Sequence, residues 1–330
     1  MKLRMGMIRS KETKEIFYKS FVSLIFRIFS YGLGFLFYFI IARDYGTYAQ
    51  GVFSIAFTVL SFVTLISKLG IETSMVKWLS SYFFNKKLGE AKYLFYRIYK
   101  ITLIFSILFT LIIFFLAEHI SIIFFKKESL ILPIKIIALA IPFFASTEII
   151  ANYFRSKKNI TFFSFYSYAS KFLLPVIIIT TCIIFYPQDY GMIIPVYSYS
   201  IGIIITGIIA LIHALSSLSK ISINTYEKIS YKNIFKVSLP MLFSSSLVML
   251  MWWSDTFILG VFRTEEEVGV YSIAVKLATI VSFVYNAVIS ILLPKIAQYY
   301  QNNEKEKLID SIQYSAKLIF LATIPMAFVL

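Results

Sequence analysis

A hexapeptide occurs twice in this chain of 330 residues. Residues 51–56 read GVFSIA, and residues 269–274, which lie 218 positions later, read GVYSIA. Further matches at the same offset are Phe39 with Phe257, Lys77 with Lys295 and Asn85 with Asn303. Several matches in one register indicate a duplication. A repeat of this kind defines the architecture before any single element does.

The composition places both copies in a membrane. Hydrophobic residues make up 59% of the chain and charged residues only 15%, whereas a soluble domain carries about 25% charged residues. A helix needs roughly 20 apolar residues to cross the hydrocarbon core. We therefore predict an all-α polytopic membrane protein. The predicted spans lie near residues 20–42, 49–68, 98–117, 130–153, 162–186, 191–214, 236–262, 268–293 and 313–330.

The basic residues behind the net charge of +15 are not spread evenly along the chain. Lysine and arginine gather in the N-terminal arm and in alternate loops, while the other loops include the acidic run 265–267. This is the positive-inside pattern, which predicts a multi-pass protein of the cytoplasmic membrane with its N-terminus in the cytoplasm. The basic loops are expected to contact membrane lipids, and no nucleic-acid partner is predicted.

The number of spans between the two copies sets their relative orientation. Six spans separate each residue from its repeat partner, so both copies run the same way through the membrane and form a parallel repeat. We expect an N-terminal six-helix lobe at 1–216, a cytoplasmic linker at 217–232, and the first three helices of a C-terminal lobe at 233–330. The second lobe is expected to be incomplete, lacking about three spans.

Inserting a charged residue within a span costs about 2.5–3.5 kcal/mol on insertion scales. Such residues therefore usually face a cavity or a partner. The candidates are Arg27, Lys135, Glu148, Lys171, Asp255 and Lys276. We predict that Arg27, Lys171 and Lys276 line a cavity and bind substrate. Snorkelling to the membrane surface or a structural salt bridge is the alternative for all three. Lys135 lies close enough to a span end to snorkel and is assigned no role.

Two interpretations are open for each of the acidic residues Asp255 and Glu148. Asp255 is predicted to couple transport to an ion, and its alternative is to act as counter-ion for a lysine such as Lys276. Glu148 is the second candidate for ion coupling, and its alternative is a local pair with Arg155. The repeat copies share a scaffold but not these charges. A site between them would hold three cations and at most one nearby acid, which favours an anionic ligand.

Signatures of other chemistry are missing from the sequence. There is no phosphate-binding G-x-x-x-x-G-K-S/T loop, and the single cysteine, Cys182, with two isolated histidines gives no metal-binding pattern. Paired carboxylates at catalytic spacing are also missing. We therefore predict no cofactor and no enzymatic activity, with a membrane-embedded glycan-assembly enzyme as a minor alternative.

The repeated segments resemble a known family. Residues 39–43 (FIIAR), 51–54 (GVFS) and 69–71 (LGI) resemble the N-terminal half of polysaccharide (Wzx-type, O-antigen) flippases. Residues 254–260 (SDTFILG) and 268–272 (VGVYS) resemble the start of the second half. The resemblance extends to the superfamily that also holds multidrug (MATE) exporters, and it implies two six-helix lobes around a central cavity that opens alternately to either side.

The resemblance also implies a substrate and partners. The expected function is to flip a polyprenyl-diphosphate-linked oligosaccharide to the outer leaflet for surface polysaccharide, including lipopolysaccharide, synthesis. A lipid-linked anionic oligosaccharide, a coupling H⁺ or Na⁺, a polysaccharide polymerase and glycosyltransferases are the implied partners. An ion-coupled drug or metabolite exporter is the alternative. Such exporters usually depend on acidic residues in the N-terminal lobe, and the arginine at position 27 of the first span weakens that alternative.

Overall fold

The computed structural model describes residues 2–185, 191–219, 221, 230–301 and 304–329. All regular elements in these ranges are helical. In chain order they are α1 (Lys2–Ile40), η1 (Ile41–Tyr45), α2 (Gly46–Lys68), α3 (Ile71–Phe84), α4 (Leu88–His119), η2 (Ile120–Phe124), η3 (Glu128–Leu130), α5 (Ile131–Ala138), α6 (Ile141–Ser156), α7 (Ile160–Ser164), η4 (Phe165–Ala169), α8 (Ser170–Phe185), α9 (Ile194–Ser219), α10 (Tyr231–Phe262), α11 (Glu265–Gln301) and α12 (Lys305–Val329).

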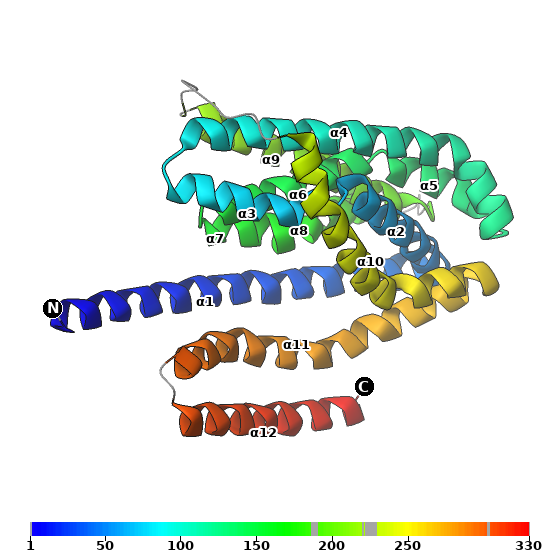
Figure 1. Ribbon diagram of the computed structural model, residues 1–330. Coiled ribbons are helices and arrows are strands. Elements are labelled where there is room, and N and C mark those ends of the chain that lie inside the picture. Colours follow the sequence, from blue (N-terminus) through cyan, green and yellow to red (C-terminus); the bar gives the residue numbers. More distant parts are fainter. Residues whose placement is uncertain (1, 186–190, 220, 222–229, 302–303, 330) are drawn as a thin grey trace.

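Figure 1 shows how these helices are arranged. Helices α2 to α9 form a bundle, and the long α1 runs along one side of it. Helix α10 crosses this bundle obliquely, whereas α11 and α12 run side by side beyond α1. We call residues 1–216 the first half and residues 233–330 the second half. Their division into two lobes remains a prediction, and most of the proposed linker at 217–232 lies outside the described residues.

The fold is that of a multi-pass membrane protein. Within the described residues, five helices are long and apolar enough to cross a membrane, or six if the bent pair α5 and α6 forms one span. The predicted spans at 20–42 and 49–68 fall in one such helical run, Phe21–Lys68. The predicted span at 268–293 lies in α11, and the predicted span at 313–330 lies in α12 as far as Val329, the last described residue. Both are long helices but are not among these five or six.

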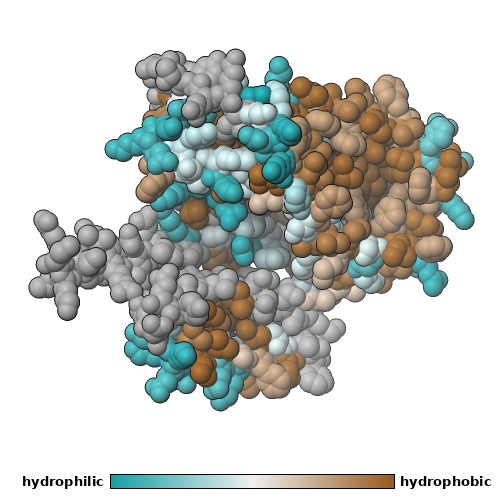
Figure 2. Space-filling model, in the orientation of Figure 1, coloured by the Kyte–Doolittle hydropathy of each residue, from teal (hydrophilic) through white to brown (hydrophobic). Residues whose placement is uncertain are grey.

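The outer surface matches this assignment. Large side chains on α4, such as Ile104, Leu108 and Leu111, are exposed rather than packed inside. Figure 2 shows hydrophobic residues covering the part of the bundle between two hydrophilic ends. Exposed apolar area of this extent is unusual for a soluble protein and is what a lipid-facing surface requires.

Two spans are interrupted by breaks. Helix α2 ends at Lys68 because Leu69 and Gly70 both take left-handed backbone angles, with φ of 54° and 68°. The chain then continues as α3, which is not among the helices long and apolar enough to cross a membrane, so this segment ends at the predicted boundary, residue 68. Helices α5 and α6 are bent by 44° at residues 139–140. Irregular backbone within a membrane protein is tolerated where protein rather than lipid surrounds it.

The repeated hexapeptides pack directly against each other where α2 crosses α11. A Cβ built on Gly51 would lie 1.7 Å from the carbonyl oxygen of Glu265, and one built on Gly269 would lie 1.9 Å from that of Thr47. Residue 265 is the repeat partner of residue 47, so the two contacts are reciprocal. Only glycine lets the backbones approach this closely. The duplicated motif therefore forms a close backbone contact between the halves.

Candidate functional site

A cavity of about 550 Å³ lies between the two halves, next to this helix crossing. Its lining includes Ser30 and Tyr38 of α1, Ser54 of α2, Phe172 of α8, Trp253 of α10 and Lys276 of α11. Among the lining residues that the structure describes there is no aspartate or glutamate. The cavity is therefore mainly aromatic and apolar, with a single kind of charge.

Lys276 supplies that charge. Its Nζ lies 4.5 Å from the ring centroid of Tyr38 and 5.9 Å from that of Trp253. Cation–π contacts of this kind contribute about 0.5–2 kcal/mol each. They hold the ammonium group in place, and no carboxylate in the described lining of the cavity compensates its positive charge. An anionic group entering the cavity would therefore be attracted to Lys276.

A bridge of hydrogen bonds between the two repeats joins two serines of the cavity lining. Gln50 donates from Nε2 to Oγ of Ser54 at 3.3 Å and to Oγ of Ser272 at 3.1 Å. Ser54 and Ser272 are repeat partners, whereas the partner of Gln50 is Val268. The bridge is thus built on a symmetric pair of serines by a residue that occurs in only one copy. The two sides of the cavity therefore differ here, although the serines on both sides are the same.

Arg27 lies beside the cavity rather than in its lining. It donates from Nη2 to the hydroxyl of Tyr168 at 2.8 Å, and its guanidinium carbon lies 4.9 Å from the centroid of that ring. The π-helical segment η4 positions Tyr168, and Ser30 donates to the Tyr168 carbonyl oxygen at 2.9 Å. Arg27 Nε is buried and makes no hydrogen bond among the described residues. The neighbouring residues Ile28 and Ser30 do line the cavity.

Lys171 and Glu148 meet inside the first half, in a buried ionic network. Lys171 Nζ lies 2.8 Å from Glu148 Oε1, and Lys68 makes a short ion pair with the other carboxylate oxygen of Glu148. Lys68 also lies 3.3 Å from Glu72 Oε1. The side chains of Lys68 and Glu72 are only 7% and 10% exposed. Two acids and two bases thus balance their charges, which reduces the penalty for burying them.

Glu148 and Lys171 each have two interpretations from the sequence. The sequence suggested a local pair between Glu148 and Arg155, but the structure places the Arg155 guanidinium 5.2 Å from the Phe163 ring. Lys171 points to Glu148 and to the ring of Phe144 at 4.8 Å, while its neighbour Phe172 lines the cavity. A salt bridge, the alternative interpretation of Lys171, is what the structure contains.

Lys68 and Glu72 were missed by the sequence analysis. The predicted span ends at residue 68, so Lys68 is its last residue and Glu72 lies beyond it, and neither was selected as a charge within a span. Their signal was their spacing, because an acid and a base four residues apart lie on one face of a helix. The left-handed residues between them tilt α3 relative to α2 without separating the two side chains.

Asp255 on α10 makes one contact to α11 and one within α10. Its Oδ2 accepts a hydrogen bond from the Tyr271 hydroxyl at 2.6 Å, and its Oδ1 accepts one from the Thr256 amide at 2.7 Å. Thr256 lines the cavity, which places Asp255 beside it. Lys276 lies against aromatic rings instead, so the suggested pair between Asp255 and Lys276 is not what the structure shows.

The halves also meet at the predicted outer end. Lys127 donates from Nζ to the carbonyl oxygens of Gly260 and Arg263, at 2.5 Å each, where α10 ends. Ser129 donates to Glu265 Oε1 at 2.5 Å. Burial lowers the pKa of Lys127, although the nearby carboxylates of Glu265 and Glu267 act in the opposite direction. A cation at a helix C-terminus stabilises the exposed carbonyl groups, so these contacts hold the outer ends of the halves together.

Solved structures with this fold are membrane transporters. The MATE multidrug transporter DinF-BH in complex with R6G superposes with a TM-score of 0.60 at 18% identity, over 95% of this chain and 71% of that one. An inward-facing multidrug resistance MATE transporter of the MOP superfamily gives a TM-score of 0.63 at 15% identity, over 93% and 72%. At these identities the likeness establishes the fold.

The sequence comparisons point to glycan assembly. A probable low-salt glycan biosynthesis flippase, Agl15 of Haloferax volcanii, is 32% identical over 76 residues, which are 23% of this chain. The match spans only 16% of that relative's length. Residues 16–300 match the family described as polysaccharide biosynthesis protein. The chain therefore belongs to the polysaccharide biosynthesis protein family, a flippase family of the MATE/MOP superfamily.

Proposed function

We propose that this protein flips a polyprenyl-diphosphate-linked oligosaccharide across the cytoplasmic membrane, from the inner to the outer leaflet, for surface polysaccharide synthesis. The observation that carries this proposal is Lys276, which faces a cavity between the halves with no carboxylate in its described lining. A diphosphate would compensate this charge, and the aromatic lining suits the apolar faces of sugar rings. The protein acts as a transporter rather than an enzyme.

The cations have different roles in this proposal. Lys276 binds the anionic part of the substrate directly. Arg27 reaches the substrate from the side of the cavity through its position next to Ile28 and Ser30. Lys171 acts when its pair with Glu148 opens, because in the described arrangement its ammonium group is engaged there. O-antigen and lipopolysaccharide precursors are proposed cargoes. Glycosyltransferases are proposed partners before the transport step, and a polysaccharide polymerase is a proposed partner after it.

Single replacements test the cationic site. In the full-length protein we expect Lys276→Ala to lower surface polysaccharide by about tenfold to a hundredfold, since a hydrogen bond to a charged group contributes about 1.5–3 kcal/mol. Arg27→Ala and Lys171→Ala should give smaller losses, and Lys276→Arg should keep part of the output. Lys135→Ala, which removes a lysine placed near Phe114, is the matched control. Unchanged output from all three variants at normal expression would contradict the proposal.

Ion coupling is assigned to Asp255 and Glu148, with H⁺ or Na⁺ as the coupling ion. Asp255 lies beside the cavity and shares its carboxylate with the Tyr271 hydroxyl, so loss of its charge would change the contact between α10 and α11. We expect Asp255→Asn to bind substrate but to lose the dependence of transport on an imposed proton or sodium gradient. Transport in vesicles at several gradients measures this. Gradient-dependent transport by Asp255→Asn at the wild-type level would exclude the role.

A drug or metabolite exporter is the second candidate, favoured by the aromatic cavity with Trp252 and Trp253 in its lining and by the MATE structures that share the fold. The two functions differ in the sign of the expected charge effect. Exporters of cationic drugs should gain from loss of a cavity lysine, so Lys276→Ala would raise drug resistance. A flippase of anionic lipids should lose transport with the same replacement.

A further inference from the structure

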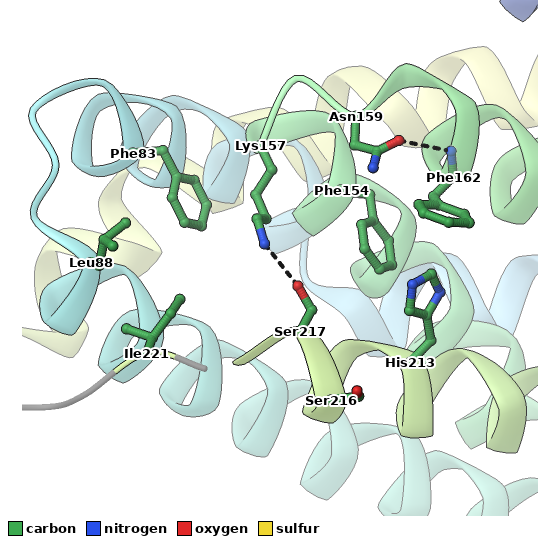
Figure 3. Close-up of a pocket in the computed structure, with 10 residues that line it drawn as sticks. All are labelled: Phe83, Leu88, Phe154, Lys157, Asn159, Phe162, His213, Ser216, Ser217 and Ile221. Atoms are coloured by element: carbon green, nitrogen blue, oxygen red, sulfur yellow. Dashed lines mark hydrogen bonds between the residues drawn. The ribbon is translucent and has the colours of Figure 1, made fainter. Parts of the chain in front are cut away.

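A pocket of about 440 Å³ lies away from the central cavity, where α3, α4, α6, α7 and α9 end together. Figure 3 shows Phe154, Phe162 and His213 pointing toward one another across this pocket. The His213 ring centroid lies 4.6 Å from that of Phe154 and 4.3 Å from that of Phe162. Lys157 reaches in from the α6–α7 turn and donates to Ser217 Oγ at 2.7 Å. We call this the aromatic pocket.

A second pocket of about 360 Å³ adjoins the first and is cationic. Lys19 enters it from α1, while Lys157 and Lys158 enter it from the α6–α7 turn. The hydroxyl of Thr161 adds a hydrogen-bonding group. Among its described lining residues there is no aspartate or glutamate. The Lys157 ammonium itself is bonded to Ser217 on the aromatic side, where the two pockets meet. Three lysine side chains around so small a volume favour a ligand with a phosphate group.

The two pockets form one amphipathic site. Lys157 and Asn159 line both of them, so a single ligand can place a charged group in the cationic pocket and an apolar group in the aromatic pocket. The turn that separates them is fixed by Asn159, whose side chain accepts a hydrogen bond from the Phe162 amide at 3.3 Å. The site also lies on the basic side of the bundle, which the charge pattern predicts to be cytoplasmic.

The position of this amphipathic site separates it from the transport path. None of its described lining residues comes from α10, α11 or α12, whereas the central cavity needs α10 and α11. We propose that the site holds an anionic phospholipid of the cytoplasmic leaflet as a resident lipid. Its phosphate lies among Lys19, Lys157 and Lys158, and its glycerol backbone and first acyl carbons contact Phe154 and Phe162. This inference does not depend on the identity of the transported substrate.

Lipid binding to the purified full-length protein tests this proposal, by native mass spectrometry with phosphatidylglycerol and phosphatidylcholine of equal chain length. We expect phosphatidylglycerol to bind more tightly. The double variant Lys157→Gln, Lys158→Gln should lose about thirtyfold in affinity for phosphatidylglycerol, since each lysine near a lipid surface contributes about 1 kcal/mol. Its affinity for phosphatidylcholine should fall less, because the choline group offsets the charge of that lipid's phosphate.

The chain offers a closely matched control. Lys86 and Lys87 form an equivalent pair in the α3–α4 turn, and Lys86 and Lys158 have φ of 57° and 60°. Neither Lys86 nor Lys87 lines the site. The variant Lys86→Gln, Lys87→Gln should therefore bind phosphatidylglycerol within twofold of wild type. Equal losses in both double variants, or equal binding of the two lipids by wild type, would overturn the proposal. The proposal would also be overturned if polyprenyl diphosphate displaced bound phosphatidylglycerol at a concentration below that of the phospholipid, because the site would then bind cargo.

Discussion

Replacing Gly51 with alanine is expected to destabilise the protein by about 3 kcal/mol or more, at or above the upper end of the range for overpacked cores. The added methyl group would lie 1.7 Å from the Glu265 carbonyl oxygen and 2.6 Å from its carbon. Both atoms belong to the backbone, so no side-chain rotation can relieve the clash. The contact between α2 and α11 would have to open. The loss is measured as a fall in the unfolding midpoint of the purified protein in mild detergent.

Two further glycines make this prediction specific. Gly269→Ala should cost a similar amount, because its Cβ would lie 1.9 Å from the Thr47 carbonyl oxygen. Gly32→Ala should be neutral or slightly stabilising, since nothing lies within 4 Å of its Cβ position and alanine is the better helix former by about 1 kcal/mol. Equal melting of Gly51→Ala and Gly32→Ala would show that the helices are not in close contact at this crossing.

Replacing Glu148 with glutamine should also cost about 3 kcal/mol. Breaking a buried pair by removing one partner typically costs 3–5 kcal/mol, and the lower end applies because the Glu148 side chain is still 20% exposed. The change leaves Lys171 facing a neutral amide and leaves Lys68 with Glu72 as its remaining acidic partner. Unfolding in mixed detergent measures the effect. Glu118→Gln, which changes an exposed carboxylate at the end of α4, is the control.

A double-mutant cycle separates the pair from the rest of the network. Lys171→Met alone should cost less than Glu148→Gln, because Glu148 keeps Lys68 and because Lys171 is 26% exposed. In the Lys171→Met background, Glu148→Gln should cost measurably less than it does in wild type. Strict additivity would mean that the two side chains do not interact in the folded protein.

The helical architecture could be predicted from sequence because its causes are local. Apolar runs of sufficient length give membrane helices, and the all-α polytopic fold was predicted on this basis. The end of α2 was predicted at residue 68, where the left-handed Leu69 and Gly70 place it. The continuation of the chain as the helix α3 was not predicted, so Lys68 and Glu72 were not selected as interior charges.

The candidate site residues could be selected from sequence because they are charges in apolar helices, but their contact partners could not be predicted. A charge in an apolar helix is visible in sequence, and Arg27, Lys171, Glu148, Asp255 and Lys276 were all selected in this way. Their contacts depend on which helices lie side by side. Tyr168 is 141 positions from Arg27, and Lys68 is 80 positions from Glu148. Nothing in the local pattern of either residue indicates such partners.

The reciprocal glycine contact has a consequence for how a chain of this kind can arise. Residue 51 touches residue 265 and residue 269 touches residue 47, which is the relation found between identical subunits across a two-fold axis. A protein with only one copy of the motif would already carry both faces of this interface and could associate with itself. Gene fusion of such a homodimer would preserve the contact. It would also free Gln50, Asp255 and Lys276 to differ from their counterparts, which an assembly of identical subunits does not allow.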